Sequence, residues 1–229
     1  MSRPLDLKNP DRLIHIGVIL PDDVNELLDV APIDVFHTLS KENARTFPDE
    51  LLPPSLKAQA IDLQLHWVSP TGKAPSRLTA GLTVVPTDSY DTCPPLDIVL
   101  MGAQTVGYQP TAADLAFVRK SFAGCAAFLT ICAGMSAPLL AGVLQGRKAT
   151  APRFMLETLR AESPGVEWLE KRWVRDDGGK VWTSGVLLNG LELVRAFVEH
   201  NWGGEGSLVQ ALMAGGSWPN RDVDYKDGP

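Results

Sequence analysis

Cysteine is scarce in this chain of 229 residues, which contains Cys93, Cys125 and Cys132 and no Cys-x-x-Cys pair. An odd number of cysteines argues against a disulfide scaffold and is typical of proteins kept in a reducing compartment. We therefore expect a cytoplasmic protein in which each thiol needs its own explanation.

Long hydrophobic runs are also missing. No segment approaches the roughly 18 apolar residues of a membrane helix, and the first residues lack the apolar core of a signal peptide. Acidic residues outnumber basic ones, 27 to 21, so the net charge is −6. We expect no membrane span and no nucleic-acid binding, because a nucleic-acid site needs a basic surface.

Metal and nucleotide motifs are absent. The histidines are His15, His37, His66 and His200, and no pair has the spacing of metal ligands. Residues 102–107 carry two glycines after a predicted strand, but they lack the Gly-x-Gly-x-x-Gly and Walker patterns. We expect no metal and no cofactor.

The chain does contain two kinds of hydrophobic pattern, one strand-like and one helix-like, which alternate along the sequence. The period of two and short apolar runs predict strands at 13–20, 61–68, 82–85, 96–101, 126–131, 168–174 and 180–184. The helical period predicts helices at 29–40, 111–122, 133–144, 152–161, 190–200 and 203–216. Thr111 and Asn189 are expected helix N-caps, and residues 176–179 an expected hairpin turn.

This order of elements is typical of βαβ units. The sequence therefore predicts an α/β fold, with a single doubly wound, mostly parallel sheet of the flavodoxin-like kind and helices on both faces. We expect one domain over residues 1–229, with a polar insertion near 41–60 and a C-terminal extension over 201–229.

The most informative position is Cys132, which lies between a predicted buried strand and a predicted buried helix. The turn there must be sharp, and Ala133 and Gly134 are small enough to allow it. This pattern indicates a nucleophile elbow with sulfur as the nucleophile. A helix N-terminus stabilises a thiolate, so we expect a lowered pKa for Cys132.

The competing interpretation of any cysteine is a buried, inert thiol. We keep it for Cys125, which precedes the same strand at its other end, and for Cys93, which lies in a Thr-Cys-Pro-Pro turn.

At these residues the chain resembles the DJ-1/PfpI superfamily, whose fold is like that of class I glutamine amidotransferases, and its isocyanide (isonitrile) hydratase branch in particular. The segments that carry the resemblance are 16–21, 26–36, 93–102, 130–134, 141–150, 174–176, 182–185 and 189–192. Residues 202–206 and 222–226 resemble the endings of long fungal versions.

The resemblance implies that Cys132 is the nucleophile and that Asp29 is the carboxylate beside it. Backbone N–H groups of Ala103 and Ala133 would bind the developing oxyanion, with Gly102 and Gly134 beside them. From the residues alone, Asp29 also fits a helix N-cap, and Glu26 competes with it as the thiol's partner.

The chain departs from the family pattern in places. Many members carry histidine directly after the cysteine, where this chain has Ala133, and a glycine pair in the oxyanion loop is Gly102-Ala103 here. The isocyanide hydratase branch often has histidine where this chain has Pro152-Arg153. Two further residues are weaker site candidates: His37, two helical turns after Asp29, and Trp182, beside a Thr-Ser-Gly segment.

The resemblance implies a cofactor-independent homodimeric enzyme that hydrates an isocyanide, a small-molecule substrate, to an N-substituted formamide. Three alternatives stay open: glyoxalase or deglycase chemistry on 2-oxoaldehydes, a tailoring or lyase step in secondary metabolism, and a thiol redox sensor of the DJ-1 type. A pseudo-enzyme is a further alternative, motivated by Ala103 and the missing histidine.

Overall fold

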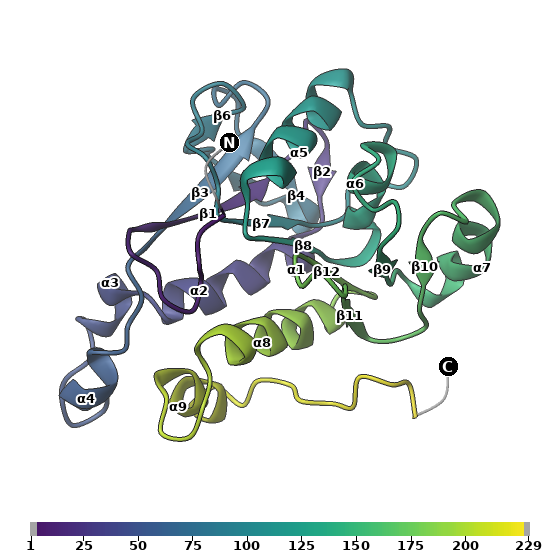
Figure 1. Ribbon diagram of the computed structural model, residues 1–229. Helices are drawn as coiled ribbons and strands as arrows, with labels where there is room; N and C mark the ends of the chain where they lie inside the picture. The colour runs from purple at the N-terminus through teal and green to yellow at the C-terminus, as the bar shows by residue number, and fades with distance from the viewer. Residues whose placement is uncertain (1–3, 227–229) are drawn as a thin grey trace.

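A seven-stranded sheet organises the molecule (Figure 1). The computed structural model describes residues 4–226. The strand order is β11-β12-β8-β7-β1-β3-β6, and every pairing is parallel except that between β11 and β12. The strands are β1 Ile14–Ile19, β3 Leu63–Ser69, β6 Asp88–Ser89, β7 Ile98–Met101, β8 Ala127–Thr130, β11 Trp173–Arg175 and β12 Val181–Ser184. The predicted fold class, α/β with a mostly parallel sheet between helices, is confirmed.

The central strands are buried on both faces, as parallel strands usually are. Alternate residues of one strand enter different cores: Ile98 and Leu100 of β7 join one cluster, whereas Val99 and Met101 join the other. This strict alternation explains why these segments are short and apolar throughout.

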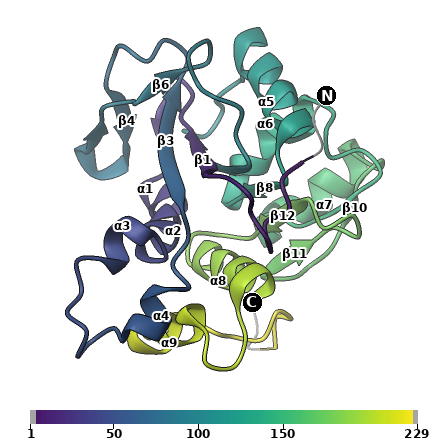
Figure 2. The ribbon, with the colours of Figure 1, turned by 60° about the vertical axis from the view of Figure 1, so that its left-hand side comes forward.

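Helices cover both faces of the sheet (Figures 1 and 2). Phe36 of α2 and Phe197 of α8 pack into the first cluster, and Phe117 of α5 and Ala137 of α6 pack into the second. The helices are α1 Leu27–Val30, α2 Asp34–Thr38, α3 Lys41–Ala44, α4 Pro54–Lys57, α5 Ala112–Gly124, α6 Ser136–Leu140, α7 Arg153–Glu162, α8 Asn189–Trp202 and α9 Leu208–Gly215, with 3-10 helices η1 Ala31–Ile33, η2 Thr79–Gly81 and η3 Cys132–Met135. No helix within residues 4–226 is long and apolar enough to cross a membrane.

Two small sheets complete the structure. β2 Val24–Asn25, β4 Ser76–Leu78 and β5 Thr83–Val84 form one, and β9 Lys148–Ala149 pairs with β10 Glu167–Trp168 in the other. The predicted strand over 168–174 is therefore two separate strands, because Glu167 and Trp168 pair with β9 while β11 forms the hairpin with β12. The turn at 176–179 is where the sequence predicts it, with Gly179 at a φ of 72°.

Several helices differ from their predictions. The segment 29–40 is broken into α1, η1 and α2, and Pro32, which lacks an N–H, lies at the break. The segment 133–144 is a 3-10 turn followed by the short helix α6, and Gly142 follows it at a φ of 79°. Asn189 is the first residue of α8 and not its cap. Thr111 caps α5 as predicted, through a capping box with Asp114.

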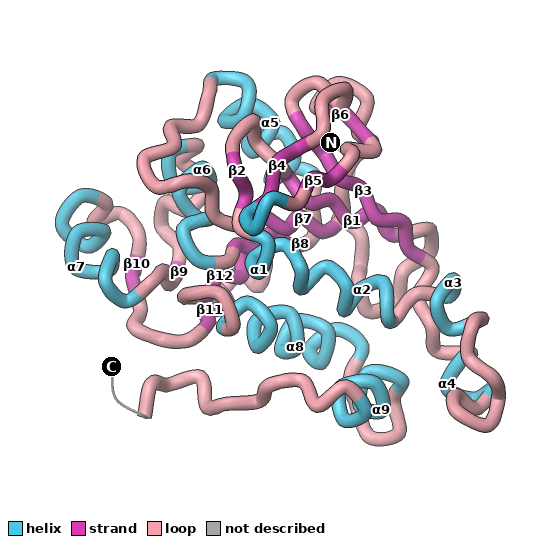
Figure 3. Tube along the Cα trace, turned by 180° about the vertical axis from the view of Figure 1, so that it is seen from behind, coloured by secondary structure: helices cyan, strands magenta, loops and turns pink. Residues whose placement is uncertain are grey.

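The polar segment 41–60 and the C-terminal segment meet. The side chain of Gln59 accepts a hydrogen bond from the N–H of Leu208 and donates one to the carbonyl of Gly206. Figure 2 shows α4 beside α9, and Figure 3 shows the last described residues running back along α8.

Candidate active site

A cleft of about 570 Å³ opens at the carboxyl ends of the central strands. The chain reaches it after β1 at Glu26, after β7 at Ala103 and after β8 at Cys132, all three of which line the cleft. Strands β1 and β7 are neighbours although β3 and β6 lie between them in sequence, so the chain reverses its direction across the sheet here. Ligands bind at such switch points in open α/β sheets.

Cys132 occupies the sharp turn that the sequence predicts. It follows β8 directly and has a φ of 58°, which is a left-handed conformation that costs a residue other than glycine about 1–3 kcal/mol. Its own N–H donates to the carbonyl of Gly185 at 3.0 Å, and the N–H of Gly134 donates to that of Ile131 at 3.0 Å. These bonds hold the turn, so the thiol projects at the end of the strand instead of into the core.

Two glycines allow the turn to pack tightly. A Cβ on Gly134 would lie 2.4 Å from the carbonyl oxygen of Met101, and one on Gly102 would lie 2.7 Å from the Cβ of Asp29. Gly134 therefore brings the turn against the end of β7, and Gly102 brings α1 against the same segment. Ala103 is not among the residues with positive φ, so its methyl group fits without backbone strain.

Asp29 is fully buried next to this turn. Its Oδ2 accepts a hydrogen bond from the N–H of Ala103 at 3.0 Å, while Oδ1 has no partner in the described part of the chain. Burial raises the pKa of Asp29 to about 7; the Ala103 N–H opposes that shift and the charge of Glu26 adds to it. Near neutral pH, Asp29 therefore holds a proton for much of the time.

The Cys132 thiol is half-buried, and its environment opposes the lowered pKa that the sequence predicts. Burial, together with the negative charge of Asp29, raises the pKa of the thiol to about 11. Backbone N–H groups of Ala133 and Leu187 act in the other direction, because they donate to the sulfur. The thiol pKa is raised because burial disfavours the thiolate and two acidic side chains, Asp29 and Glu26, lie close by.

The negative charge of Asp29 disfavours the thiolate of Cys132. When Asp29 is protonated, that repulsion disappears.

Glu26 has a structural role at the start of α1. Its side chain caps α1, accepting from the N–H of Leu28 at 3.3 Å and from the hydroxyl of Thr79 at 3.1 Å, and its N–H donates to the carbonyl of Ala103 at 2.8 Å. Asp29 is a candidate N-cap from the sequence, but the residue that caps α1 is Glu26. Both carboxylates are near the thiol, but Asp29 has the larger effect on it.

The expected oxyanion donors are both engaged. The N–H of Ala103 donates to Asp29 and that of Ala133 donates to the sulfur. Ala103 can bind a substrate oxyanion only by exchanging its bond with the carboxyl group.

The remaining candidates lie elsewhere. Trp182 is a buried core residue, stacked on Trp173 and edge-on to Phe197, because alternate residues of β12 enter opposite sides of the sheet. Trp182 is not among the cleft residues. His37 is in the last turn of α2 and is not among the cleft residues.

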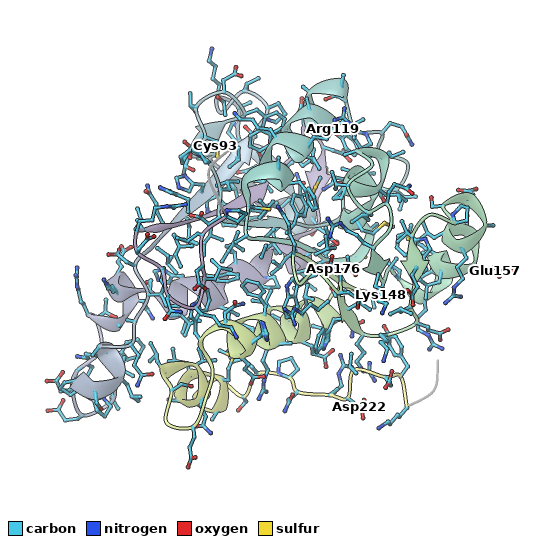
Figure 4. All side chains as sticks on the ribbon, in the orientation of Figure 1. Cys93, Arg119, Lys148, Glu157, Asp176 and Asp222 are labelled. Carbon is cyan, nitrogen blue, oxygen red and sulfur yellow. The ribbon has the colours of Figure 1, made fainter. Side chains whose placement is uncertain are left out.

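The other two thiols are buried in the second core cluster. Burial raises the pKa values of Cys93 and Cys125 to about 12. Figure 4 shows Cys93 in the region of β6. These thiols have the inert environment that the sequence predicts.

The cleft wall contains residues that the sequence did not single out. Val106, Phe154 and Met155 give it an apolar surface, and no Lys, Arg or His from residues 4–226 lines it. Leu187 contributes a backbone donor at a φ of 32°. No sequence signal points to Leu187, because its role depends on its backbone. The described residues contain no His, Cys, Asp and Glu cluster suited to a metal ion.

The molecule therefore belongs to the class of α/β proteins that carry a cysteine in the sharp turn after a central parallel strand, close to a buried carboxyl. The DJ-1/PfpI family model matches residues 16–200, and the chain belongs to this family.

Individual relatives agree with that assignment. The isonitrile hydratase of Pseudomonas putida is 31% identical over 169 residues, which is 70% of each chain. Drosophila melanogaster DJ-1beta superposes with a TM-score of 0.68 at 16% identity, covering 91% of this chain and 100% of that one. A THiJ/PfpI family protein from Pseudomonas syringae gives a TM-score of 0.66 at 19% identity, covering 95% and 80%.

Proposed function

We propose that this protein is a cofactor-independent enzyme that hydrates an isocyanide to an N-substituted formamide, with Cys132 as the nucleophile. The observation that carries the proposal is the thiol of Cys132, which lines the cleft from a sharp turn close to the fully buried Asp29, whose Oδ1 has no partner among the described residues. The similarity to an isonitrile hydratase supports the choice of reaction.

The chemistry can be written with Cys132 and Asp29 alone. The Cys132 sulfur attacks the terminal isocyanide carbon, a C–S bond forms, the S–H bond breaks, and the carbon takes up the proton that the thiol loses, giving a thioimidate. Water then adds to the same carbon, the C–S bond breaks, and the nitrogen gains a proton. Asp29 supplies and recovers the protons, which is ordinary general acid–base catalysis by a group with a pKa near neutrality.

The cleft suits a neutral substrate. Glu26 places an acidic side chain at its surface, and no cationic side chain from the described residues lines it. A carboxylate or phosphate on the substrate would be repelled, whereas the apolar body of a neutral isocyanide can contact Phe154 and Met155.

A panel of isocyanides tests the proposal, with methylglyoxal included for the glyoxalase alternative. We expect formamide production by the wild type, none by Cys132→Ala, and unchanged production by Cys93→Ala as the matched thiol control. Turnover of methylglyoxal alone, or formamide production that survives Cys132→Ala, would refute the proposed reaction.

A thiol redox sensor is the second candidate, because the N–H groups of Ala133 and Leu187 donate to the sulfur and could hold sulfinate oxygens. The raised pKa of the thiol lowers the fraction of thiolate that peroxide can oxidise at neutral pH. Stoichiometric oxidation of Cys132 by peroxide without turnover of any substrate would favour the sensor.

We further propose that the protein forms a homodimer in the cytoplasm, as the family resemblance implies. Light scattering after size-exclusion chromatography should give twice the chain mass of 24.8 kDa. A mass equal to one chain would exclude the dimer.

A further inference from the structure

The last described residues form a tail that contacts segments next to the candidate site. Residues 217–226 run along α8, and Figure 4 shows Asp222 on this segment. The tail is fixed to the chain before β11: the N–H of Arg172 donates to the carbonyl of Val223 at 2.8 Å, and Lys171 pairs with Asp224 in an antiparallel bridge.

Tyr225 sits between two guanidinium groups. The Arg153 and Arg172 guanidinium carbons lie 4.8 Å and 4.7 Å from its ring centroid, an arrangement that cation–π attraction stabilises. Arg153 begins α7, and the next two residues, Phe154 and Met155, form a wall of the cleft. One aromatic ring thus links the tail to that wall.

The Tyr225 hydroxyl reaches the segment behind Cys132. It donates to Oδ1 of Asn189 at 3.0 Å, and it packs so closely over Gly185 that a Cβ there would lie 2.8 Å from it. The N–H of Gly185 donates to the carbonyl of Arg172 at 2.9 Å, and its carbonyl accepts from the N–H of Cys132 at 3.0 Å. Tyr225 therefore contacts the residue that hydrogen-bonds the Cys132 backbone.

The segment between Gly185 and Asn189 has little burial of its own. Val186 and Leu188 are 43% and 56% exposed, and Leu187, whose N–H donates to the sulfur, has a positive φ of 32°. A strained segment with exposed side chains needs contacts from elsewhere to keep one geometry. Tyr225 and Asn189 are such contacts.

We propose that Tyr225 is a positioning residue, which holds segment 185–188 against Cys132 and thereby keeps the Leu187 N–H directed at the sulfur. The inference rests on the proposed function only in taking Cys132 as the reacting thiol. Its test measures the thiol directly and needs no turnover.

The experiment is alkylation of the purified full-length protein by iodoacetamide across pH, with the Cys132 peptide quantified by mass spectrometry. In Tyr225→Ala we expect the pH midpoint of alkylation to rise and the rate at pH 8 to fall by about tenfold, the effect of losing one hydrogen bond to a charged group. Tyr225→Phe keeps the ring and should show a smaller shift in the same direction. Asp224→Asn removes only an exposed ion pair of the tail and should match the wild type.

An alkylation profile of folded Tyr225→Ala that matches the wild type, or that moves to lower pH, would overturn the proposal, whatever happens to the melting temperature. If Tyr225→Ala does not fold, Tyr225→Leu decides by the same criteria. A wild-type protein that is alkylated as expected but hydrates no isocyanide would contradict the proposed function and would not affect the inference about Tyr225.

Discussion

Two buried aspartates, Asp29 in α1 and Asp114 in α5, have pKa values that are shifted in opposite directions. Asp29, beneath the cleft, has one hydrogen bond and a pKa raised to about 7 by burial. Asp114, at the start of α5, accepts from the hydroxyls of Tyr90, Tyr108 and Thr111 and from the N–H of Thr111. Burial raises its pKa too, but these bonds outweigh burial and the net shift is downward.

The comparison teaches that burial alone does not mark a catalytic carboxyl. Asp114 has its hydrogen-bonding capacity filled and stabilises a helix terminus. Asp29 keeps one oxygen unpaired among the described residues and is coupled to a thiol. A carboxyl left incompletely satisfied is available to exchange a proton, which supports the proposed role of Asp29, whereas the hydrogen bonds of Asp114 support a structural role.

The largest expected effect belongs to the nucleophile. Cys132→Ser replaces the thiol by a far weaker nucleophile, so kcat for isocyanide hydration should fall by at least about a thousandfold, with the melting temperature close to that of the wild type. Steady-state assays with calorimetry check both. A variant that retains a tenth of the wild-type rate would contradict the proposed role.

The second prediction separates the two aspartates by activity. Asp29→Asn removes the proton donor and should lower kcat by about a hundredfold or more. Asp114→Asn should leave kcat within about threefold of the wild type, because α5 carries no proposed reacting group, but it should destabilise the protein by about 2–3 kcal/mol. Equal losses of kcat in Asp29→Asn and Asp114→Asn would contradict the distinction between the two aspartates. If Glu26→Gln removes activity while Asp29→Asn retains it, the wrong carboxylate has been chosen.

The third prediction concerns the pH dependence of stability. The pKa of Asp29 is raised, so its contribution is fully present below its unfolded value of 3.8 and is lost as the pH rises through about 7. Asp29→Asn should therefore raise the melting temperature at pH 8 relative to the wild type, and much less at pH 4.

The contribution of Asp114 to stability should have the opposite pH dependence. Its pKa is lowered, so its contribution is present above 3.8 and is lost as the pH falls through the lower folded-state value. Asp114→Asn should lower the melting temperature at pH 8, with a smaller difference in acid. Melting curves of both variants across pH measure this, and shifts of the same sign at pH 8 would contradict it.

The smallest effect is expected at Ala103. Ala103→Gly restores the glycine of the family pattern but keeps the N–H that Asp29 accepts, and the native backbone needs no positive φ there. We expect kcat to change by less than about threefold. A gain of tenfold or more in the hydration assay would show that the alanine methyl group obstructs the cleft.

Much of the fold follows from local patterns. The alternation of apolar runs with helical periods indicates the parallel sheet, and the N-cap at Thr111 is readable in the sequence. The sequence does not predict the break at Pro32, because a proline within a helical period can be tolerated or can end the helix. It does not predict the core position of Trp182 either, because that position depends on which side of the sheet each residue of β12 enters.

By itself the sequence determined that Cys132 differs from Cys93 and Cys125, because a sharp turn between a buried strand and a small-residue segment is a local property. Only the tertiary structure decided the rest of the site. Asp29 and Glu26 approach the thiol from α1 and its N-cap, Leu187 approaches it from the segment after β12, and Tyr225 contacts Asn189 next to that segment. Their burial, coupling and hydrogen bonds arise only when those segments fold together, because electrostatic interactions depend on distance and desolvation and not on position in the sequence.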